Sequence, residues 1–362
     1  MLKKFDIYII KKYLSSFFFT MLLITLMAVV IDFSEKINRF IDAELPISRI
    51  LGEYYLNFIP WINGMMWPLF SLIAVIFFTS RLAKNSEIVA LLSSGISFNR
   101  IIWPYIVSAS IIASLLWVGK NYVIPHSCKI KNNFEAEHLS KKHEKTLNSD
   151  VHFFLNPDEK VYIRYYRRAD TTAQSFRLEK FSDNKLIEVL KAEKLVFKKA
   201  PNEWTFKNYS IREFNGNKET LTKFDRQSKD TILDLTPDDF IQNMKQMENM
   251  TTRDLNEFIK REKGRGLGEA KNFLIEKHMR QSQPFTIIIL TLIGLAVAAR
   301  KVRGGMGLHL ALGVVIGAAF VILSKFAATF SNNLSLSPAL GAWLPNIFFG
   351  VIALWLLRGS QK

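Results

Sequence analysis

The sequence is poor in cysteine. Its 362 residues include one cysteine, Cys128, so an intrachain disulfide and a multi-cysteine metal site are both excluded. His138 and His143 stand five residues apart and do not share one face of a helix, so we expect solvated side chains rather than metal ligands. We therefore expect neither a metal site nor a resident cofactor in this chain.

Motifs for enzymatic chemistry are also missing. The chain has no G-x-x-x-x-G-K-[ST] phosphate loop, no H-E-x-x-H and no G-x-S-x-G. The glycines at positions 264, 266 and 268 follow no predicted strand, which a dinucleotide site requires. We expect no catalytic residues, and any ATP that the protein's work consumes must be hydrolysed elsewhere.

What the sequence does contain is six long uncharged stretches, three on each side of a polar middle section. They run over Tyr13–Ile31, Tyr54–Ser80, Ile101–Gly119, Ser282–Ala299, Gly304–Ser324 and Phe326–Leu357. Each holds the 18 or more mostly apolar residues that cross a hydrocarbon layer about 30 Å thick. The sequence predicts a membrane protein with a 3+3 arrangement of transmembrane helices.

The charges orient these predicted spans. A net charge of +16 is compatible with a nucleic-acid partner. In a membrane protein, however, the positions of the basic residues relative to the spans are more informative than the net charge. If the middle section lies outside, the inside segments hold twelve Lys and Arg against only Asp6 and Glu87, as the positive-inside rule requires. We expect both termini in the cytoplasm, a retained first span and no nucleic-acid partner.

The middle section is predicted to be a folded β-domain. Between residues 120 and 280 it carries 32 Lys and Arg and 25 Asp and Glu, a mixture typical of a solvated surface. Apolar and polar residues alternate in short runs such as Val161–Tyr165, Ser175–Glu179 and Glu203–Phe206, with turn residues such as Asn156-Pro157-Asp158 between them. The pattern favours an antiparallel sandwich or partial barrel carried on two helical stalks, Phe134–Lys145 and a segment running into the fourth span.

A short helix is predicted in the second inside loop, at about residues 83–96. Asn85 or Ser86 can cap it, and Gly95 can end it. Ile88, Val89, Leu91 and Leu92 form an apolar stripe. By itself this pattern also fits an ordinary interfacial connector in which Glu87 stabilises the helix start.

This loop resembles the coupling helix of the lipopolysaccharide export permease family LptF/LptG (YjgP/YjgQ), which has the form S-E-(hydrophobic)3-(x)2-S/A-G-(x). Ser86, Glu87, Ile88 and Gly95 occupy the matching places. The resemblance extends along the chain to Asp6-x-Tyr8, Gly341-Ala342-x-Leu344-Pro345 and Leu354–Arg358, and it leans toward the LptG branch. It implies six transmembrane helices, with a periplasmic antiparallel β-jellyroll-like domain inserted between the third and fourth. The expected divisions are 1–119, 120–281 and 282–362.

The resemblance also implies partners and a task. An LptF-like and an LptG-like permease pair over a dimer of the cytoplasmic ATPase LptB, which holds the ATP and Mg²⁺. They draw lipopolysaccharide from the inner membrane and pass it through their periplasmic domains and an LptC-like protein to an LptA-like bridge. In this chain the implied ATPase-coupling residues are Ser86, Glu87, Ile88, Leu91, Leu92 and Gly95.

Three basic residues are candidates for the substrate's phosphates. Lys36 and Arg39 lie one turn apart at the end of the first span, although Asp32 and Trp61 stand where lysines occur in relatives. Lys325 lies near the outer end of the fifth span, where an intramembrane charge is a functional candidate. Solvation of Lys36 and Arg39, and snorkelling of Lys325, are equally compatible with the sequence.

Two other functions remain compatible with the sequence. An ABC permease for another lipid or for a lipoprotein would share the coupling helix without needing the β-domain. A membrane-anchored sensor or scaffold with a ligand-binding β-domain would need a cytoplasmic output domain, but the inside segments are short.

Overall fold

The structure is a computed structural model. It describes residues 4–139, 146–167, 170–183, 185–199, 202–216, 218–237, 244–264, 270–300, 305–333 and 336–360. The chain forms two compact units. A helical unit comprises Met1–Phe134, Glu248–Arg253 and Lys271–Lys362, and a sheet unit comprises Glu135–Met247 and Asp254–Ala270.

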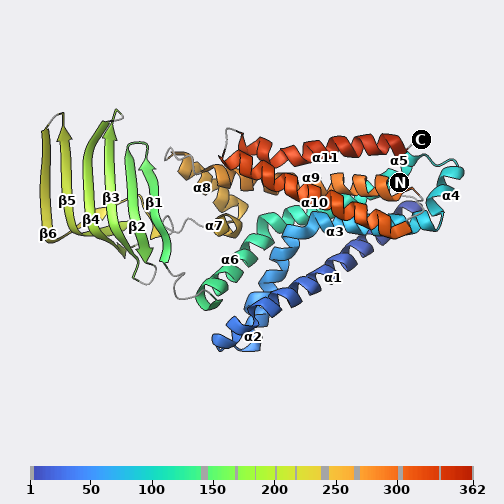
Figure 1. The fold of residues 1–362 in the computed structure, drawn as a ribbon, viewed down its shortest axis with the longest axis horizontal. Helices are drawn as coiled ribbons and strands as arrows, with labels where there is room; N and C mark the ends of the chain where they lie inside the picture. The colour runs from blue at the N-terminus through green and yellow to red at the C-terminus, as the bar shows by residue number, and fades with distance from the viewer. Residues whose placement is uncertain are drawn as a thin grey trace. The chain divides into compact units, whose positions relative to one another are not determined.

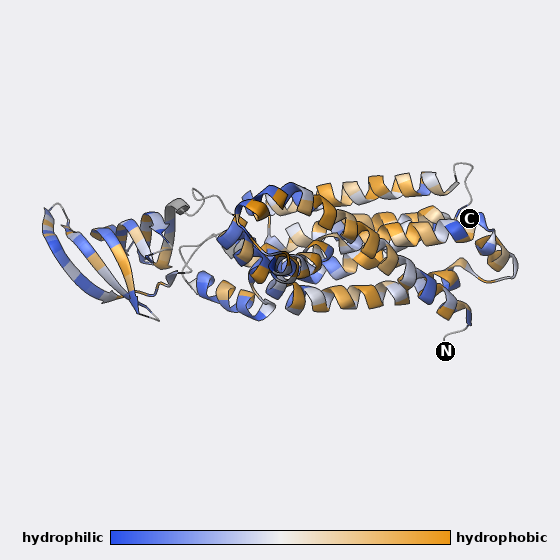
Figure 2. Ribbon diagram, turned by 90° about the horizontal axis from the view of Figure 1, so that it is seen from below, coloured by the Kyte–Doolittle hydropathy of each residue, from blue (hydrophilic) through white to orange (hydrophobic). Residues whose placement is uncertain are grey.

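The helical unit contains the membrane-spanning segments. Its helices are α1 (Lys4–Asp42), α2 (Ile47–Arg49), η1 (Ile50–Tyr55), α3 (Leu56–Lys84), α4 (Glu87–Ser93), α5 (Phe98–Val118), η2 (Gly119–Val123), α6 (Ile124–Phe134), α9 (Ala270–Ala298), α10 (Gly305–Asn333) and α11 (Pro338–Ser360) (Figure 1). Six helical runs in the described residues are long and apolar enough to cross a membrane (Figure 2). They confirm the predicted six-helix membrane fold.

The boundary between the fifth and sixth spans differs from the predicted boundary at Lys325. α10 continues through Lys325 to Asn333, so the apolar stretch Phe326–Leu357 belongs to two helices rather than to one span. A single lysine interrupts an apolar pattern without disturbing helical hydrogen bonds. The new helix begins instead at Pro338, a favoured first helical residue, and Ser337 accepts a hydrogen bond from the amide of Leu340 at 3.3 Å.

The interior of the helical unit combines a continuous apolar core with a few paired polar groups. Tyr13 on α1 shares hydrogen bonds of 2.7 Å with the hydroxyls of Ser71 on α3 and Thr291 on α9, and all three residues are buried. A Cβ at Gly294 would come 2.4 Å from Val75, so α9 and α3 approach as closely as only glycine permits. These contacts fix the register of three helices.

The sheet unit is built on one open antiparallel sheet. Its strands, β1 (Thr146–Asn156), β2 (Glu159–Arg167), β3 (Thr172–Ser182), β4 (Lys185–Lys199), β5 (Glu203–Asn215) and β6 (Lys218–Ile232), pair in chain order. One face buries an apolar cluster in which Trp204 donates a hydrogen bond to the carbonyl of Leu235 at 2.8 Å. An open antiparallel sheet between the third and fourth spanning helices confirms the predicted jellyroll-like class.

Two strand details differ from the sequence pattern. The predicted run Glu203–Phe206 is only the start of a longer strand, β5, which continues past a bulge at Asn208 (φ 50°). The Asn208 side chain accepts a hydrogen bond from the amide of Arg226 at 3.0 Å. β6 was not predicted. Almost all its residues are exposed on both faces, so no alternation marks it.

The helical connections largely follow the predictions. α7 (Met244–Asn249) precedes α8 (Thr252–Gly264), and α9 runs without a break into the fourth span, as predicted for the second stalk. Beyond residue 119 the third spanning helix continues through η3 (Glu135–Leu139), while Ser140–Lys145, the rest of the predicted stalk, lies outside the described residues along with His143. Within the described part of the chain, no group of three or more His, Cys, Asp or Glu could hold a metal ion.

Candidate functional site

The α4 helix is held by its two ends. At its start Ser86 occupies the N-cap position with φ 59° but makes no side-chain cap, so the predicted capping by Ser86 is wrong. Asn85 does not cap the backbone either, and instead donates a hydrogen bond to the Glu87 carboxylate at 3.2 Å. At its end the amides of Gly95 and Ile96 donate to the carbonyls of Leu92 (3.1 Å) and Leu91 (3.2 Å). These two hydrogen bonds form a Schellman motif, and Gly95 adopts the positive φ that the motif requires, 81°.

The apolar stripe of α4 is divided between two environments. Ile88 is 2% exposed and belongs to the core of the helical unit, and Leu91 packs against that core. Val89 and Leu92 are 51% and 41% exposed. Ile88 therefore anchors the helix to its own chain, and the face that remains for another molecule carries Val89 and Leu92. Figure 1 places α4 at the same end of the helical unit as the start of α1 and the end of α11.

Next to α4, Arg100 on α5 binds Asp6 on α1 through two parallel hydrogen bonds. The guanidinium nitrogens lie 2.7 and 2.6 Å from the two carboxylate oxygens. The Asp6 side chain is fully buried, while that of Arg100 is 34% exposed. Bidentate pairs of this kind are strong and directional.

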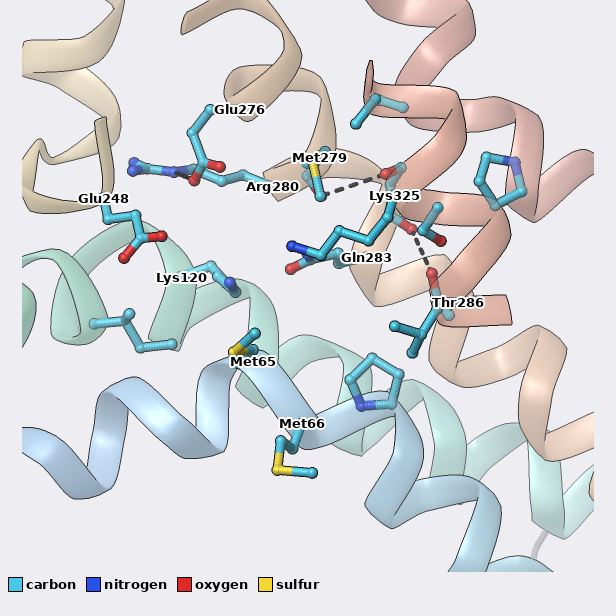
Figure 3. A pocket seen from close by; sticks show the side chains of 18 of the residues that line it. Met65, Met66, Lys120, Glu248, Glu276, Met279, Arg280, Gln283, Thr286 and Lys325 are labelled. Carbon is cyan, nitrogen blue, oxygen red and sulfur yellow. Dashed lines mark hydrogen bonds and ion pairs between the residues drawn. The ribbon is translucent and has the colours of Figure 1, made fainter. Parts of the chain in front are cut away.

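A cavity of about 600 Å³ lies within the helical unit (Figure 3). Side chains from α3, η2, α6, α9, α10 and α11 line it, and residue 248 of α7 closes one side. Much of its wall is apolar, with Met65 and Met66 on α3 and Phe320 on α10. Its volume falls in the range of sites for small organic ligands.

Five charged side chains face this cavity: Lys120, Glu248, Glu276, Arg280 and Lys325. Arg280 binds Glu276 at 2.9 Å, and Glu248 accepts a hydrogen bond from Trp61 at 3.1 Å. Neither Lys120 nor Lys325 has an ion pair with any described carboxylate. The cavity thus combines hydrocarbon walls with two lysines whose charge is not neutralised by contact.

A buried polar atom also faces the cavity. The Oε1 atom of Gln283 accepts no hydrogen bond from the residues that the structure describes. Figure 3 shows the Lys325 side chain reaching toward Gln283. A buried amide oxygen without a donor has a free-energy cost, which a ligand or water molecule with a hydrogen-bond donor removes.

The other two candidate cations have different environments. Lys36 binds Asp32 at 2.8 Å and also donates to the Tyr54 hydroxyl, and Tyr54 in turn donates to Asp32 at 3.0 Å. Its charge is therefore already compensated within the chain. Arg39 is exposed in the last turn of α1. Near Trp61, the ammonium of Lys131 lies 4.3 Å from the indole ring centre.

The comparison with known families agrees with this architecture. The sequence model of the family described as "Lipopolysaccharide export system permease LptF/LptG" matches residues 7–359. The chain belongs to this family. The lipopolysaccharide export system permease protein LptG of Escherichia coli strain K12 is 20% identical to it over 355 residues, which cover 97% of each chain. The protein of the same name from an O6:H1 strain of Escherichia coli matches to the same extent.

Members of the LptF/LptG family are transporter components. The sequence singled out Lys325 but missed Lys120, Arg280 and Gln283, which surround the same space. Gln283 was detectable in principle, because it is an amide within two residues of the start of an apolar span. Lys120 was read as the first residue of the polar section, and only the fold shows that it faces the cavity.

Proposed function

We propose that this chain is a permease subunit of an ABC transporter that extracts lipopolysaccharide from the inner membrane and passes it to a periplasmic bridge. The observation that carries the proposal is the family match, which spans all six membrane helices and the sheet between them. In this proposal both termini are cytoplasmic, the sheet is periplasmic, and a homologous LptF-like permease completes the membrane part.

The exposed face of α4 is the proposed contact with a separate LptB-like ATPase dimer, which binds the ATP and Mg²⁺. Val89 and Leu92 supply apolar surface, and Glu87 supplies a carboxylate at the helix start. Ser86 and Gly95 set the ends of the helix, and Ile88 and Leu91 fix it to the membrane helices. A movement of the ATPase can then act on the spans through this helix of 7 residues, which is about two turns long.

The cavity is the proposed contact with lipid. Lys120 and Lys325 are placed to attract a phosphate, while the methionines and Phe320 offer an apolar wall to hydrocarbon. Arg39 is free to contact a second phosphate, whereas the Asp32 carboxylate competes for Lys36. Lys325 is therefore the strongest of the three candidates, ahead of Arg39 and Lys36.

The β6 strand is the proposed route to the next protein. It is a 15-residue edge strand with exposed side chains, and pairing with another strand would satisfy its outer hydrogen-bonding groups. An LptC-like protein and an LptA-like bridge are the partners that such an edge fits.

Reconstitution tests the proposal. The complete complex in proteoliposomes should release lipopolysaccharide to a bridge protein only when ATP is present.

Replacement of Leu92 by Asp should abolish release and ATPase binding, while the Ile47→Asp control on an exposed residue of α2 should retain both. Lys325→Gln should weaken release without affecting ATPase binding. ATP-dependent movement of a phospholipid, with lipopolysaccharide left in place, would contradict the proposed substrate.

A further inference from the structure

The geometry of the Asp6–Arg100 pair is not explained by stabilisation of the α1 N-terminus alone. An acidic residue in the first turn of a helix commonly stabilises the helix dipole, but it does so while exposed to water. Asp6 is instead fully buried and bonded to a residue 94 positions away. A buried ion pair is a weak source of stability compared with apolar side chains of the same size, and it is best attested as a device that fixes register.

Arg100 is rigidly connected to α4. Four residues, Ser94–Ser97, separate the two helices, and the amide of Arg100 donates to the carbonyl of Ser97 at 3.0 Å. At the α4 end of this four-residue connection, the amides of Gly95 and Ile96 bond to the last turn of α4 in the Schellman motif. Ile96 also packs against the core of the helical unit. Because little of this corner is free to bend, a displacement of α4 reaches Arg100.

Asp6 is rigidly connected to the whole of α1. This helix runs for 39 residues and contains neither proline nor glycine, whereas α3, α5, α9 and α11 each contain proline. Its buried residues are few, and four of the five lie in its N-terminal half: Asp6, Ile9, Tyr13 and Phe17. α1 is thus a stiff rod whose first turns are the most deeply buried, and whose far end is held by the buried Phe40 and by Asp32, which accepts a hydrogen bond from Tyr55 at 3.2 Å.

We propose that Asp6 and Arg100 form a latch that makes the first membrane span follow movements of α4. The proposal rests on the function assigned above, since α4 moves only if it contacts an ATPase. The bidentate pair can transmit both translation and rotation from α5 to α1, because two parallel hydrogen bonds resist rotation of one side chain about a single contact with the other. Asp6 and Arg100 act through the helices that they join, so they are positioning residues.

Distance measurements between spin labels test the latch directly. In a Cys128→Ser background, cysteines replace the exposed residues Val30 on α1 and Val351 on α11, and the complete complex is measured with and without trapped ATP. The latch predicts a nucleotide-dependent shift that Asp6→Asn abolishes. The matched control, Glu53→Gln, removes a carboxylate from the exposed ion pair with Arg49 and should leave the shift intact.

Activity supplies the second readout. Asp6→Asn should reduce lipopolysaccharide release about tenfold or more while ATP hydrolysis stays within about twofold, which corresponds to the loss of a typical coupling free energy. The exchanged pair, Asp6→Arg with Arg100→Asp, should recover part of both the shift and the release.

The outcomes separate the latch from the function on which it rests. If the label distance in the wild-type complex ignores ATP, the proposed coupling itself is overturned, and the latch with it. If the wild-type distance responds and Asp6→Asn responds equally, the latch alone is overturned. If assembly, hydrolysis and release all fall in proportion while the shift persists in the assembled fraction, the pair is only structural.

Discussion

The helical unit and the sheet unit treat charge differently. In the helical unit Asp6 is buried completely and held by two short bonds from Arg100. In the sheet unit Lys198 on β4 and Asp230 on β6 pair with side chains that are more than half exposed. Water already solvates the second pair, so its formation changes little, whereas the first carboxylate depends on its partner. Burial, not the number of ion pairs, decides which charges matter here.

The largest effect should follow from Arg100→Leu, which leaves the buried Asp6 carboxylate without its bidentate partner. The change leaves the buried Asp6 carboxylate uncompensated, and the partial exposure of Arg100 makes the cost smaller than for a pair in which both members are buried. Denaturant unfolding in detergent measures the change. Asp6→Asn should cost less, because it removes the charge that requires pairing. Equal stability of Arg100→Leu and wild type would show that the pair resembles the surface pairs of the sheet.

A smaller effect should follow from Thr291→Val. This change removes the hydrogen bonds of the Thr291 hydroxyl to the buried Tyr13 hydroxyl (2.7 Å) and to the Ser71 hydroxyl (3.1 Å), and it keeps the shape of the side chain. We expect a loss of about 1 to 2 kcal/mol in the same unfolding measurement. Thr329→Val on α10 is the control and should change stability less, because this exposed hydroxyl bonds among the described residues only to the carbonyl of Lys325, in its own helix. The opposite ranking would contradict the importance of the buried hydroxyl cluster.

Gly95→Ala should destabilise α4 locally by about 1 kcal/mol. Alanine pays a steric penalty at φ 81°, although space for its Cβ is available. Hydrogen exchange at the amides of Gly95 and Ile96 should accelerate about fivefold, since their bonds close the helix. Gly52→Ala in η1, with equally open surroundings and an ordinary φ, provides the comparison.

The smallest effect should come from Asp230→Asn in the sheet. Hydrogen bonds from Lys198 and then Thr205 hold the pKa of Asp230 below its ordinary value of 3.8. A lowered pKa stabilises the fold above the unfolded value and loses this contribution as pH falls through the folded value. The stability difference between Asp230→Asn and wild type should therefore be slight at pH 7 and vanish in acid below the folded pKa. A difference that grows in acid would reverse the assigned sign.

Much of the fold followed from simple periodicity. Apolar runs long enough to span a membrane, and alternation in the middle section, were sufficient for six helices and an antiparallel sheet. The failures have equally simple causes. β6 lacks alternation because both its faces are exposed. The fifth spanning helix, α10, continues through Lys325 because a charge lowers the local hydropathy without breaking backbone hydrogen bonds.

The candidate sites were harder to predict, since sequence shows which residues are charged but not which are already paired. Lys36 looked equivalent to Lys325, yet Asp32 binds one and no described carboxylate binds the other. Similarly, Ile88 and Leu92 belong to one stripe, and only the packing of α4 shows that the first is core and the second is surface.

By itself the sequence determined the class of the protein, its six spans and the family to which it belongs. These depend on local composition and on spacings within one segment, which the linear order preserves. Only the tertiary structure decided which charges meet. Asp6 and Arg100 lie 94 residues apart, and the cavity takes its lining from helices at both ends of the chain. Such pairings arise when helices pack, because their partners are chosen by distance in space rather than by distance along the chain.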